Sequence, residues 1–480
     1  MIESLTFFRF RFGTQLIRSN PIFLRDAEHI FRLQQKRFRK LIRHAVRASP
    51  YYAHKFAGIN LEACALTDLT IITKREMMEN FDDVITDRTV RREDVQRFVE
   101  DPSNLGKLFK GKYAIAHTSG TQGQPALIVH DGKALALTFA VQVVRGSLGS
   151  NEIVPHIKHL FSPALLAIVT LRPDFYPSAF FFSYLPPGLK AFLRIKWLSV
   201  FDPIEQTVGV LNEFKPNIIT GYTSALETLA REENAGRLHL QASGDLKQII
   251  NISEPLPQLS RMDIENAFGL AVSDRYMMGE CLALSSGCPT YPGCHLNADW
   301  AILEVVDEAY HPVPPGQKGA NVLLTNLYNS VQPFIRYEVD DAVMMSPTPC
   351  LCGSVLPLIR SIDGRSKDTL WIEREGRYQE LPYYLFLAAL HNELDMAEHQ
   401  IIQNGVNRYT LRAMPLPGRS LSPSRLRRLV FQSAESEGLE KYLNLDIEIV
   451  DQIERGPSGK AIRVKNTFGP PPDMIMAKSA

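Results

Sequence analysis

A loop of small and hydroxyl-bearing residues separates two apolar segments in the first third of the chain. The sequence HTSGTQGQP runs from His117 to Pro125, between YAIA and ALIV. Its glycines allow backbone N–H groups to come close to an anion, and Thr118, Ser119 and Thr121 add hydroxyl donors. The GxxxxGK[ST] pattern of a Walker A loop is absent. The segment therefore predicts either a phosphate-binding loop or an ordinary turn between two strands.

Two later stretches carry carboxylates suited to a nucleotide. In SDRYMMGECLAL, Glu280 closely follows Tyr276, and a carboxylate there can hold Mg²⁺ against a phosphate. The alternative is a surface glutamate at the start of a helix. In QPFIRYEVDDAV, a strand ends at Asp340 and Asp341. An aspartate at a strand end can accept hydrogen bonds from ribose hydroxyls, and the alternative is turn chemistry.

Two basic stretches follow toward the C-terminus. The sequence GRSKD combines Arg365, Lys367 and Asp368 where the residue pattern changes, and a hinge would lie there if two domains move. In RGPSGKAIRV, Lys460 follows a Pro-Ser turn and precedes a short strand. Such a lysine is normally solvated, but beside a reacting carboxylate it would stabilise developing negative charge.

Four residues have the types and spacing of a zinc site. Cys288 and His295 form one pair, and Cys350 and Cys352 form the other. Three thiolates and one imidazole would make a closed tetrahedral site for Zn²⁺, with a structural rather than a catalytic role. Cys294 is an alternative ligand. The competing interpretation is a set of buried cysteines without metal.

The elements that must position these residues alternate between strand and helix. Residues 26–48 are expected to form a helix, and residues 113–116 and 126–130 two short strands around the loop. Between residues 201 and 268 the pattern reads helix, strand, helix, strand, helix. This alternation predicts an α/β domain with a substantially parallel sheet.

Two further changes of pattern divide the rest of the chain. From about residue 299 to about residue 362 the sequence is β-rich, which predicts a β subdomain. After GRSKDT the order is helix, strand, helix, strand, which predicts a small α+β domain. We therefore expect a large N-terminal domain over residues 1–366, built of α/β layers with the β subdomain, and a small mobile C-terminal domain over residues 367–480.

Composition limits the classes of partner. The chain has 480 residues, 45% of them hydrophobic and 22% charged, which suits a globular protein of two or three domains. A net charge of +1 argues against a nucleic-acid partner. We see no signal peptide and no apolar run long enough to span a membrane. The expectation is a cytoplasmic protein with cysteines that are thiols or metal ligands. The oligomeric state stays open, a dimer included.

The first fifty residues are an exception, because lysine and arginine far outnumber the acids there. One helical stripe is predicted within them, and it consists of Phe31, Phe38, Leu41, Ile42 and Ala45. The simpler interpretation is a surface helix docked on the domain. The alternative is peripheral contact with an anionic membrane surface.

In order and spacing, these motifs resemble those of the adenylate-forming superfamily of acyl-CoA synthetases. The chain is most similar to the phenylacetate–CoA ligase-like branch, and within it to adenylating enzymes related to deazaflavin-cofactor adenylylating synthetases and capsule-biosynthesis proteins. The resemblance extends over nearly the whole chain, from LIRHAVRASPYY onward. It implies ATP-dependent, AMP-forming activation of a small carboxylic acid, followed by transfer to coenzyme A. The alternatives are adenylation without thioester formation and a degenerate nucleotide-binding homologue.

The resemblance assigns roles at the phosphate end of the site. Phosphate binding falls to the loop that resembles SSGTTGKP, namely Thr118, Ser119, Gly120, Thr121 and Gly123. Glu280 resembles the magnesium-binding glutamate, and Lys460 the lysine of the adenylation half-reaction. Arg365 resembles the nucleotide-contacting arginine, and Lys367 occupies the hinge position. Thr121, Glu280, Arg365 and Lys460 are thus the expected catalytic residues.

The nucleoside end follows from the same resemblance. Ser253, Glu254 and Pro255 resemble the GEP segment beside the adenine. Tyr276 resembles the tyrosine that stacks on the base, and Asp341 the aspartate that binds the ribose. The implied cofactors are ATP, Mg²⁺, coenzyme A and a structural Zn²⁺, since some members of the branch carry a similar zinc site.

The chain also departs from the family pattern. Gln124 replaces the loop lysine, and Asp340 replaces the glycine before the ribose aspartate. The glycine loop of the thioester step has only a poor counterpart around Gly376, which weakens the expectation for coenzyme A more than for adenylation. The acid is not identified by the sequence, and we expect Tyr222 and Thr223 to line its pocket.

Overall fold

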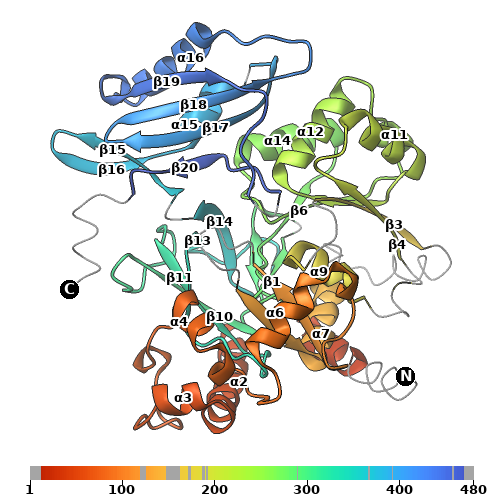
Figure 1. Ribbon diagram of the computed structural model, residues 1–480, viewed down its shortest axis with the longest axis vertical. Helices are drawn as coiled ribbons and strands as arrows, with labels where there is room; N and C mark the ends of the chain where they lie inside the picture. The colour runs from red at the N-terminus through yellow and green to blue at the C-terminus, as the bar shows by residue number, and fades with distance from the viewer. Residues whose placement is uncertain are drawn as a thin grey trace.

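The computed structural model describes residues 12–118, 126–146, 163–170, 175–185, 190, 193–288, 290–365, 368–391, 393–456 and 459–469. A large body carries the first three quarters of the chain, and a smaller C-terminal domain lies against one end of it (Figure 1). The described residues form a mixed α/β fold, as predicted. The predicted division after residue 366 lies outside the described residues, between β14 and β15.

A parallel sheet forms one layer of the large body. Its five strands run in the order β4-β3-β5-β6-β7, and every neighbouring pair is parallel. They are β3 (Ala164–Thr170), β4 (Leu193–Ser199), β5 (Ile218–Gly221), β6 (Gln248–Ile252) and β7 (Val272–Arg275). Branched side chains of β5 and β6 are buried against the helices that alternate with these strands, which confirms the predicted sheet.

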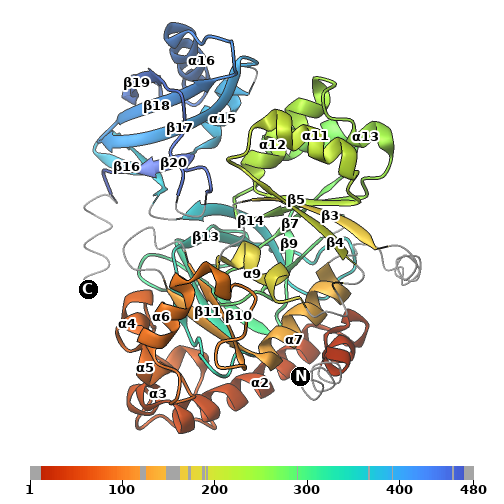
Figure 2. The ribbon, with the colours of Figure 1, turned by 45° about the vertical axis from the view of Figure 1, so that its right-hand side comes forward.

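Four helices accompany this sheet (Figure 2). They are α11 (Ile204–Phe214), α12 (Thr223–Asn234), α13 (Leu240–Ser243) and α14 (Gln258–Phe268). Leu211, Leu226 and Ile264 share one buried cluster with Ile219 and Ile249 of the strands. The first turn of α12 directly follows β5, so its residues lie at the carboxyl edge of the sheet, where ligands of open α/β sheets bind.

The phosphate-loop candidate connects an antiparallel pair. Strand β1 (Tyr113–His117) pairs with β2 (Leu127–Asp131), within one residue of the predicted bounds. Helix α7 (Gly132–Val141) follows, and the Asp131 side chain caps it by accepting from two backbone N–H groups. Helix α9 (Pro177–Ser183) contacts β1.

One long helix, α2, and four shorter ones lie at the end of the large body away from the C-terminal domain (Figure 2). They are α2 (Ala27–Ala48), α3 (Pro50–Lys55), α4 (Lys74–Glu79), α5 (Phe81–Val84) and α6 (Arg92–Glu100). Helix α2 docks through Phe38, Ile42 and Ala45, but Phe31 of the predicted stripe is 57% exposed and Ile30 is buried instead. No helix in the described part of the chain has the length and apolarity of a membrane span.

Two antiparallel sheets make up the β-rich part of the large body. One has the order β10-β11-β12 and the other β13-β14-β9-β8. Their strands are β8 (Ser285–Gly287), β9 (Cys294–Leu296), β10 (Ala301–Val306), β11 (Asn321–Asn326), β12 (Tyr337–Val339), β13 (Asp341–Met345) and β14 (Leu358–Arg365). The second sheet includes β8 and β9, which precede the predicted start at residue 299.

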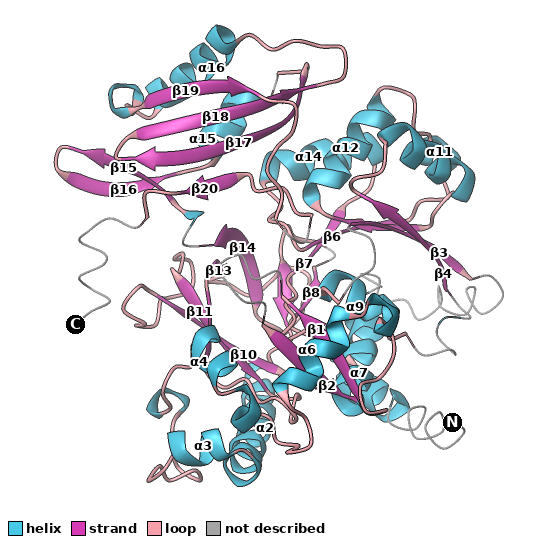
Figure 3. Cartoon of the chain, in the orientation of Figure 1, coloured by secondary structure: helices cyan, strands magenta, loops and turns pink. Residues whose placement is uncertain are grey.

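The C-terminal domain is a mixed sheet with two helices (Figure 3). The sheet order is β19-β18-β17-β20, and a separate hairpin pairs β15 with β16. The elements are β15 (Leu370–Arg374), β16 (Arg377–Leu381), α15 (Tyr384–Leu390), β17 (Met396–Gly405), β18 (Arg408–Pro415), α16 (Pro423–Ser436), β19 (Asn444–Ile449) and β20 (Val464–Asn466). One strand was expected over 399–414, but the chain turns back at Asn407, whose φ is 55°.

Candidate active site

The candidate residues meet where the C-terminal domain faces the large body. Strands β6, β7 and β14 end in this region, β13 begins there, and the segment before β20 approaches it from the other domain (Figure 3). The predicted residues therefore come from both domains and from several separate parts of the sequence.

Thr118 closes the base of the phosphate-loop candidate. Its hydroxyl accepts from the Ala126 N–H at 3.0 Å, and its own N–H donates to the Ala126 carbonyl at 3.0 Å. The predicted loop residues Ser119, Gly120, Thr121 and Gly123 lie outside the described residues, as does Gln124. Their roles remain predictions.

Lys74 is a site residue that the sequence analysis missed. Its ammonium donates to the Thr118 hydroxyl at 3.2 Å. Burial lowers the pKa of Lys74 and the Arg365 charge adds to this, while the carboxylates of Glu280 and Asp340 oppose it. Within the described residues, Lys74 has no carboxylate at ion-pair distance. This cation therefore has spare capacity for an anion at the base of the loop.

Glu280 has the environment of a cation ligand. Its side chain is buried, and the carboxylate accepts from the Tyr337 hydroxyl at 3.2 Å. Burial raises the pKa of Glu280, and no cation of the described residues neutralises it at ion-pair distance. A buried carboxylate without an ion-pair partner fits the oxygen-ligand preference of Mg²⁺.

The turn before Glu280 is tightly fixed. The His130 ring lies 2.9 Å from the Gly279 carbonyl oxygen, which makes its Nε2–H the donor. A Cβ atom at Gly279 would come within 2.5 Å of the Ile128 side chain. This close approach requires glycine at position 279, in the segment YMMGE.

The predicted base-stacking and ribose-binding residues are direct neighbours. The Tyr276 hydroxyl donates to the Asp341 carboxylate at 2.7 Å. Asp341 is the cross-strand partner of Arg365, since it begins β13 and Arg365 ends β14. Burial raises the pKa of Asp341, while the Tyr276 hydrogen bond and the Arg365 and Lys460 charges act in the opposite direction.

The segment Ser253–Pro255 forms a strained turn after β6. Ser253 has a φ of 69°, an unusual conformation for a residue with a side chain. Asn251 holds the turn by donating to the Glu254 carbonyl at 2.9 Å, and Thr223 does so by donating to the Pro255 carbonyl at 2.8 Å. Such strain persists only where the surroundings enforce it, which is common at ligand sites.

The two predicted pocket residues lie at the start of α12. The Tyr222 ring is fully buried in the core beside the parallel sheet. The Thr223 hydroxyl contacts Asn251 and the Pro255 carbonyl. Thr223 thus shapes the turn beside the adenine candidate, and the pocket role of both residues remains a prediction.

Lys460 reaches this group from the C-terminal domain. Burial lowers the pKa of Lys460, and so does the nearby Arg365 charge, while Glu254 and Asp341 act in the opposite direction. The lysine therefore lies within the same electrostatic neighbourhood as the ribose and adenine candidates. The hinge candidate Lys367 lies outside the described residues.

The four predicted zinc ligands converge. The ligand atoms of Cys288, His295, Cys350 and Cys352 all lie within 4.8 Å of one another. The Cys288 and Cys350 sulfur atoms are 3.5 Å apart, and His295 Nε2 is 3.2 Å from the Cys352 sulfur. His295 Nδ1 lies 3.0 Å from the Leu356 carbonyl oxygen, so its N–H points there and Nε2 is left free to bind a metal.

Cys294, the alternative ligand, is not part of this cluster. It precedes His295 on β9, and consecutive side chains of a strand point to opposite faces. Its thiol is buried in a core cluster with Tyr276 and Ala283. The remaining four residues fit a closed tetrahedral zinc site.

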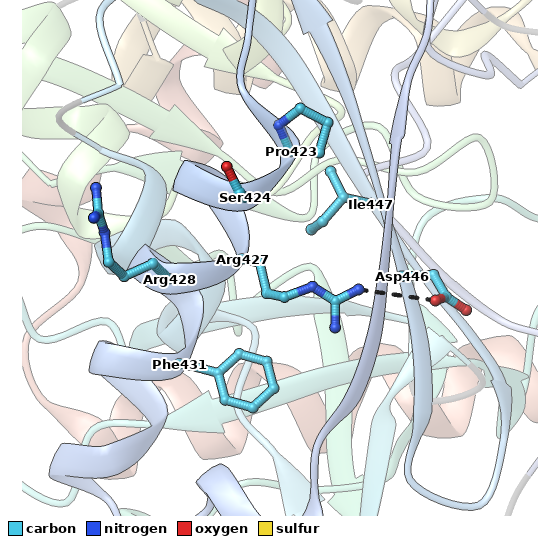
Figure 4. A pocket seen from close by; sticks show the side chains of 7 residues that line it. All are labelled: Pro423, Ser424, Arg427, Arg428, Phe431, Asp446 and Ile447. Atoms are coloured by element: carbon cyan, nitrogen blue, oxygen red, sulfur yellow. Dashed lines mark ion pairs between the residues drawn. The ribbon is translucent and has the colours of Figure 1, made fainter.

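A hollow on the C-terminal domain lies apart from all these residues (Figure 4). It lies between α16 and β19, where Arg427 pairs with Asp446 at 4.0 Å and Phe431 forms one wall. Its residues include none of the predicted site residues, so it is not the nucleotide site.

Two known proteins are similar to this chain in sequence. No family model matches the chain. The chain is 25% identical over 213 residues to a phenylacetate–coenzyme A ligase of Thermus thermophilus, a match that covers 41% of this chain and 47%, about half, of that protein. It is 21% identical over 456 residues to protein CapK of Staphylococcus aureus, covering 91% and 89% of the two chains.

Solved structures share the fold over nearly the full length. A 2-hydroxyisobutyryl-CoA ligase in the postadenylation state with 2-HIB-AMP matches with a TM-score of 0.66 and 18% identity, covering 93% of this chain and 92% of that one. The same ligase with 2-HIB-AMP and CoA in the thioesterification state matches with a TM-score of 0.57 and 20% identity, covering 94% and 92%. These relatives and the shared fold confirm the predicted resemblance to the adenylate-forming enzymes and their phenylacetate–coenzyme A ligase-like branch.

Proposed function

We propose that this protein uses ATP to convert a small carboxylic acid into an acyl-adenylate and then transfers the acyl group to coenzyme A. The observation that carries the proposal is the approach of the Lys460 segment to the large body, where the neighbouring Ala461 N–H donates to Glu254 at 2.9 Å and the Lys460 charge acts on Asp341. In the first step the carboxylate of the acid attacks the α-phosphorus and pyrophosphate leaves. A lysine at that junction binds both anions and fixes their approach.

The phosphate end of the site would hold the leaving pyrophosphate. Lys74 and the Thr118 hydroxyl lie together at the base of the loop, and the loop residues 119–123 are proposed to add backbone donors. Glu280 would hold Mg²⁺, which supplies neutralisation of the phosphate charges when it is bound. Lys74 would contribute a fixed positive charge where the loop sequence itself has neither lysine nor arginine.

The nucleoside of ATP would be bound by Asp341 and by the turn at residues 253–255. Asp341 would accept from the ribose hydroxyls, and its hydrogen bond from Tyr276 fixes the carboxylate for that task. The strained turn at residues 253–255 would lie beside the adenine. Because Thr223 and Asn251 hold this turn without any ligand contact, it is preorganised for the base.

The second half of the proposal concerns the acceptor of the acyl group. Gly376 lies at the tip of the β15–β16 hairpin with a φ of 79°, and the surrounding sequence only weakly resembles a thioester-step loop. The solved relative binds CoA, which supports transfer to coenzyme A. Adenylation without thioester formation is the second candidate, and the dependence of product formation on coenzyme A decides between them.

The Cys3His cluster is proposed to bind a structural zinc ion. It joins the turn between β8 and β9 to the segment before β14, far apart in sequence. All four ligands come from protein, so no position stays open for catalysis.

The proposal is tested by ATP–pyrophosphate exchange with a panel of aryl and fatty carboxylic acids. We expect exchange that requires one class of acid and that is lost in Lys460→Ala. ATP binding without exchange for any acid would instead identify a degenerate homologue, for which Gln124 and Asp340 are the candidate causes.

A further inference from the structure

A bidentate ion pair joins the two domains close to Lys460. Arg463 donates through Nη1 to one carboxylate oxygen of Glu227 at 3.2 Å and through Nη2 to the other. The two side chains are only 19% and 17% exposed. Paired, partly buried contacts between guanidinium and carboxylate are among the stronger and more directional polar interactions.

The surroundings favour the charged form of both partners. Burial alone would raise the pKa of Glu227, but the charge and the hydrogen bonds of Arg463 outweigh it and lower the pKa. The Tyr383 hydroxyl lies 2.8 Å from His399 Nε2. Burial and the Arg463 charge lower the pKa of His399 to about 4, so His399 is neutral and does not compete for Glu227.

A second contact lies next to the first. The Ala461 N–H donates to the Glu254 carboxylate at 2.9 Å, and the same carboxylate accepts from the Ser224 N–H at 2.9 Å. Ser224 and Glu227 are one turn apart on α12 and therefore face the same side. One interdomain contact is thus made directly to α12, and the other reaches its N-terminal part through Glu254.

The segment that carries Lys460 is firmly held in its own domain. The Arg463 carbonyl accepts from the Ile401 N–H at 2.8 Å, and the Ile462 carbonyl from the Gln400 side chain at 2.7 Å. The Lys460 carbonyl accepts from the Gly456 N–H at 2.9 Å. Because Lys460 and Arg463 share this fixed segment, the ion pair sets the position of Lys460 relative to the large body.

We propose that Glu227 and Arg463 form an interdomain latch that holds Lys460 at the nucleotide for adenylation and opens when the C-terminal domain leaves. This rests on the function proposed above. Both are positioning residues, since neither touches a reacting atom. Breaking the latch should therefore slow the adenylation half-reaction and leave the later half-reaction unaffected.

The test compares Glu227→Gln, Arg463→Gln and the charge exchange that combines Glu227→Arg with Arg463→Glu. The matched control is Arg412→Gln, because Arg412 pairs with Glu448 at 2.8 Å within the C-terminal domain. Hydrogen–deuterium exchange of residues 459–465 is measured without substrate. We expect faster exchange in both single variants, partial recovery in the charge exchange, and no change in the control.

The kinetic readout separates the two half-reactions. In the single variants, kcat of pyrophosphate exchange should fall about tenfold to a hundredfold without a matching rise in the KM for ATP. Thioester formation from supplied acyl-adenylate and coenzyme A should stay at the wild-type rate. Thermal unfolding of each variant verifies that both domains remain folded.

Three results would overturn a claim. Unchanged hydrogen exchange in both single variants would show that the ion pair does not hold the Lys460 segment against the large body. Faster hydrogen exchange with unchanged pyrophosphate exchange would show that the ion pair joins the domains but has no role in adenylation. Absence of pyrophosphate exchange in the wild-type protein would overturn the proposed function, while the hydrogen-exchange comparison would still decide whether the pair joins the domains.

Discussion

Replacement of Lys74 by methionine should weaken ATP binding. The ammonium of Lys74 donates to the Thr118 hydroxyl at 3.2 Å, at the base of a loop whose sequence has neither lysine nor arginine. Methionine keeps most of the apolar volume of the lysine side chain and removes only the charge. The variant therefore tests whether this charge is directed at phosphate.

The magnitude follows from the geometry of the site. A unit charge about 5 Å from a phosphate charge contributes about 3 kcal/mol at an effective dielectric constant of about 20. Lys74 is only partly buried and Arg365 lies nearby, so solvent screening and this second cation reduce its contribution to about 2 kcal/mol. We therefore expect an affinity for MgATP about thirtyfold lower in Lys74→Met.

The assay is calorimetric titration of the protein with MgATP, accompanied by the KM for ATP in pyrophosphate exchange. Lys74→Arg should retain most of the affinity, because the charge remains. Lys112→Met is the matched control, since Lys112 is 69% exposed and pairs only loosely with Asp87 at 4.0 Å. A change below about twofold in Lys74→Met would refute the assignment of Lys74 to the phosphates.

Three other outcomes are expected. Metal analysis should find zinc bound in wild type and in Cys294→Ser. Zinc should be lost in Cys352→Ser, and the Tm of this variant should be lower, because Cys352 belongs to the cluster and Cys294 does not. Burial lowers the pKa of His130 from 6.5 to about 4. Between these values the unfolded chain binds a proton that the native state does not, so stability should fall by up to about 3 kcal/mol as pH drops through this window. His130→Gln should flatten that dependence in urea unfolding. Tyr276→Phe frees the Asp341 carboxylate of its 2.7 Å hydrogen bond and should raise the KM for ATP severalfold in pyrophosphate exchange.

The fold was predictable where local pattern and burial coincide. Strands β5 and β6 are short apolar runs between amphipathic helices, and such runs become the buried strands of a parallel sheet. The stripe on α2 was only partly right. Ile30 packs in a different core cluster from Phe38 and Ile42, so the buried face shifts along the helix and Phe31 is left outside.

The site was predictable where family motifs or ligand types marked it. The neighbours Tyr276 and Asp341, and the four residues of the Cys3His cluster, were all named from the sequence. Lys74 and Arg463 were not, because their partners are 44 and 236 residues away in the sequence. Nothing in the local pattern around a lysine or arginine indicates which distant segment it will meet.

One carboxylate takes part in two different equilibria. Glu254 belongs to the turn proposed to lie beside the adenine, and it also accepts from the Ala461 N–H of the other domain. If both interactions depend on the same orientation of Glu254, nucleotide affinity and domain position are thermodynamically linked. The linkage is reciprocal: whatever factor the docked domain adds to nucleotide affinity, the nucleotide adds to the docking equilibrium. Departure of the product would then itself favour release of the domain.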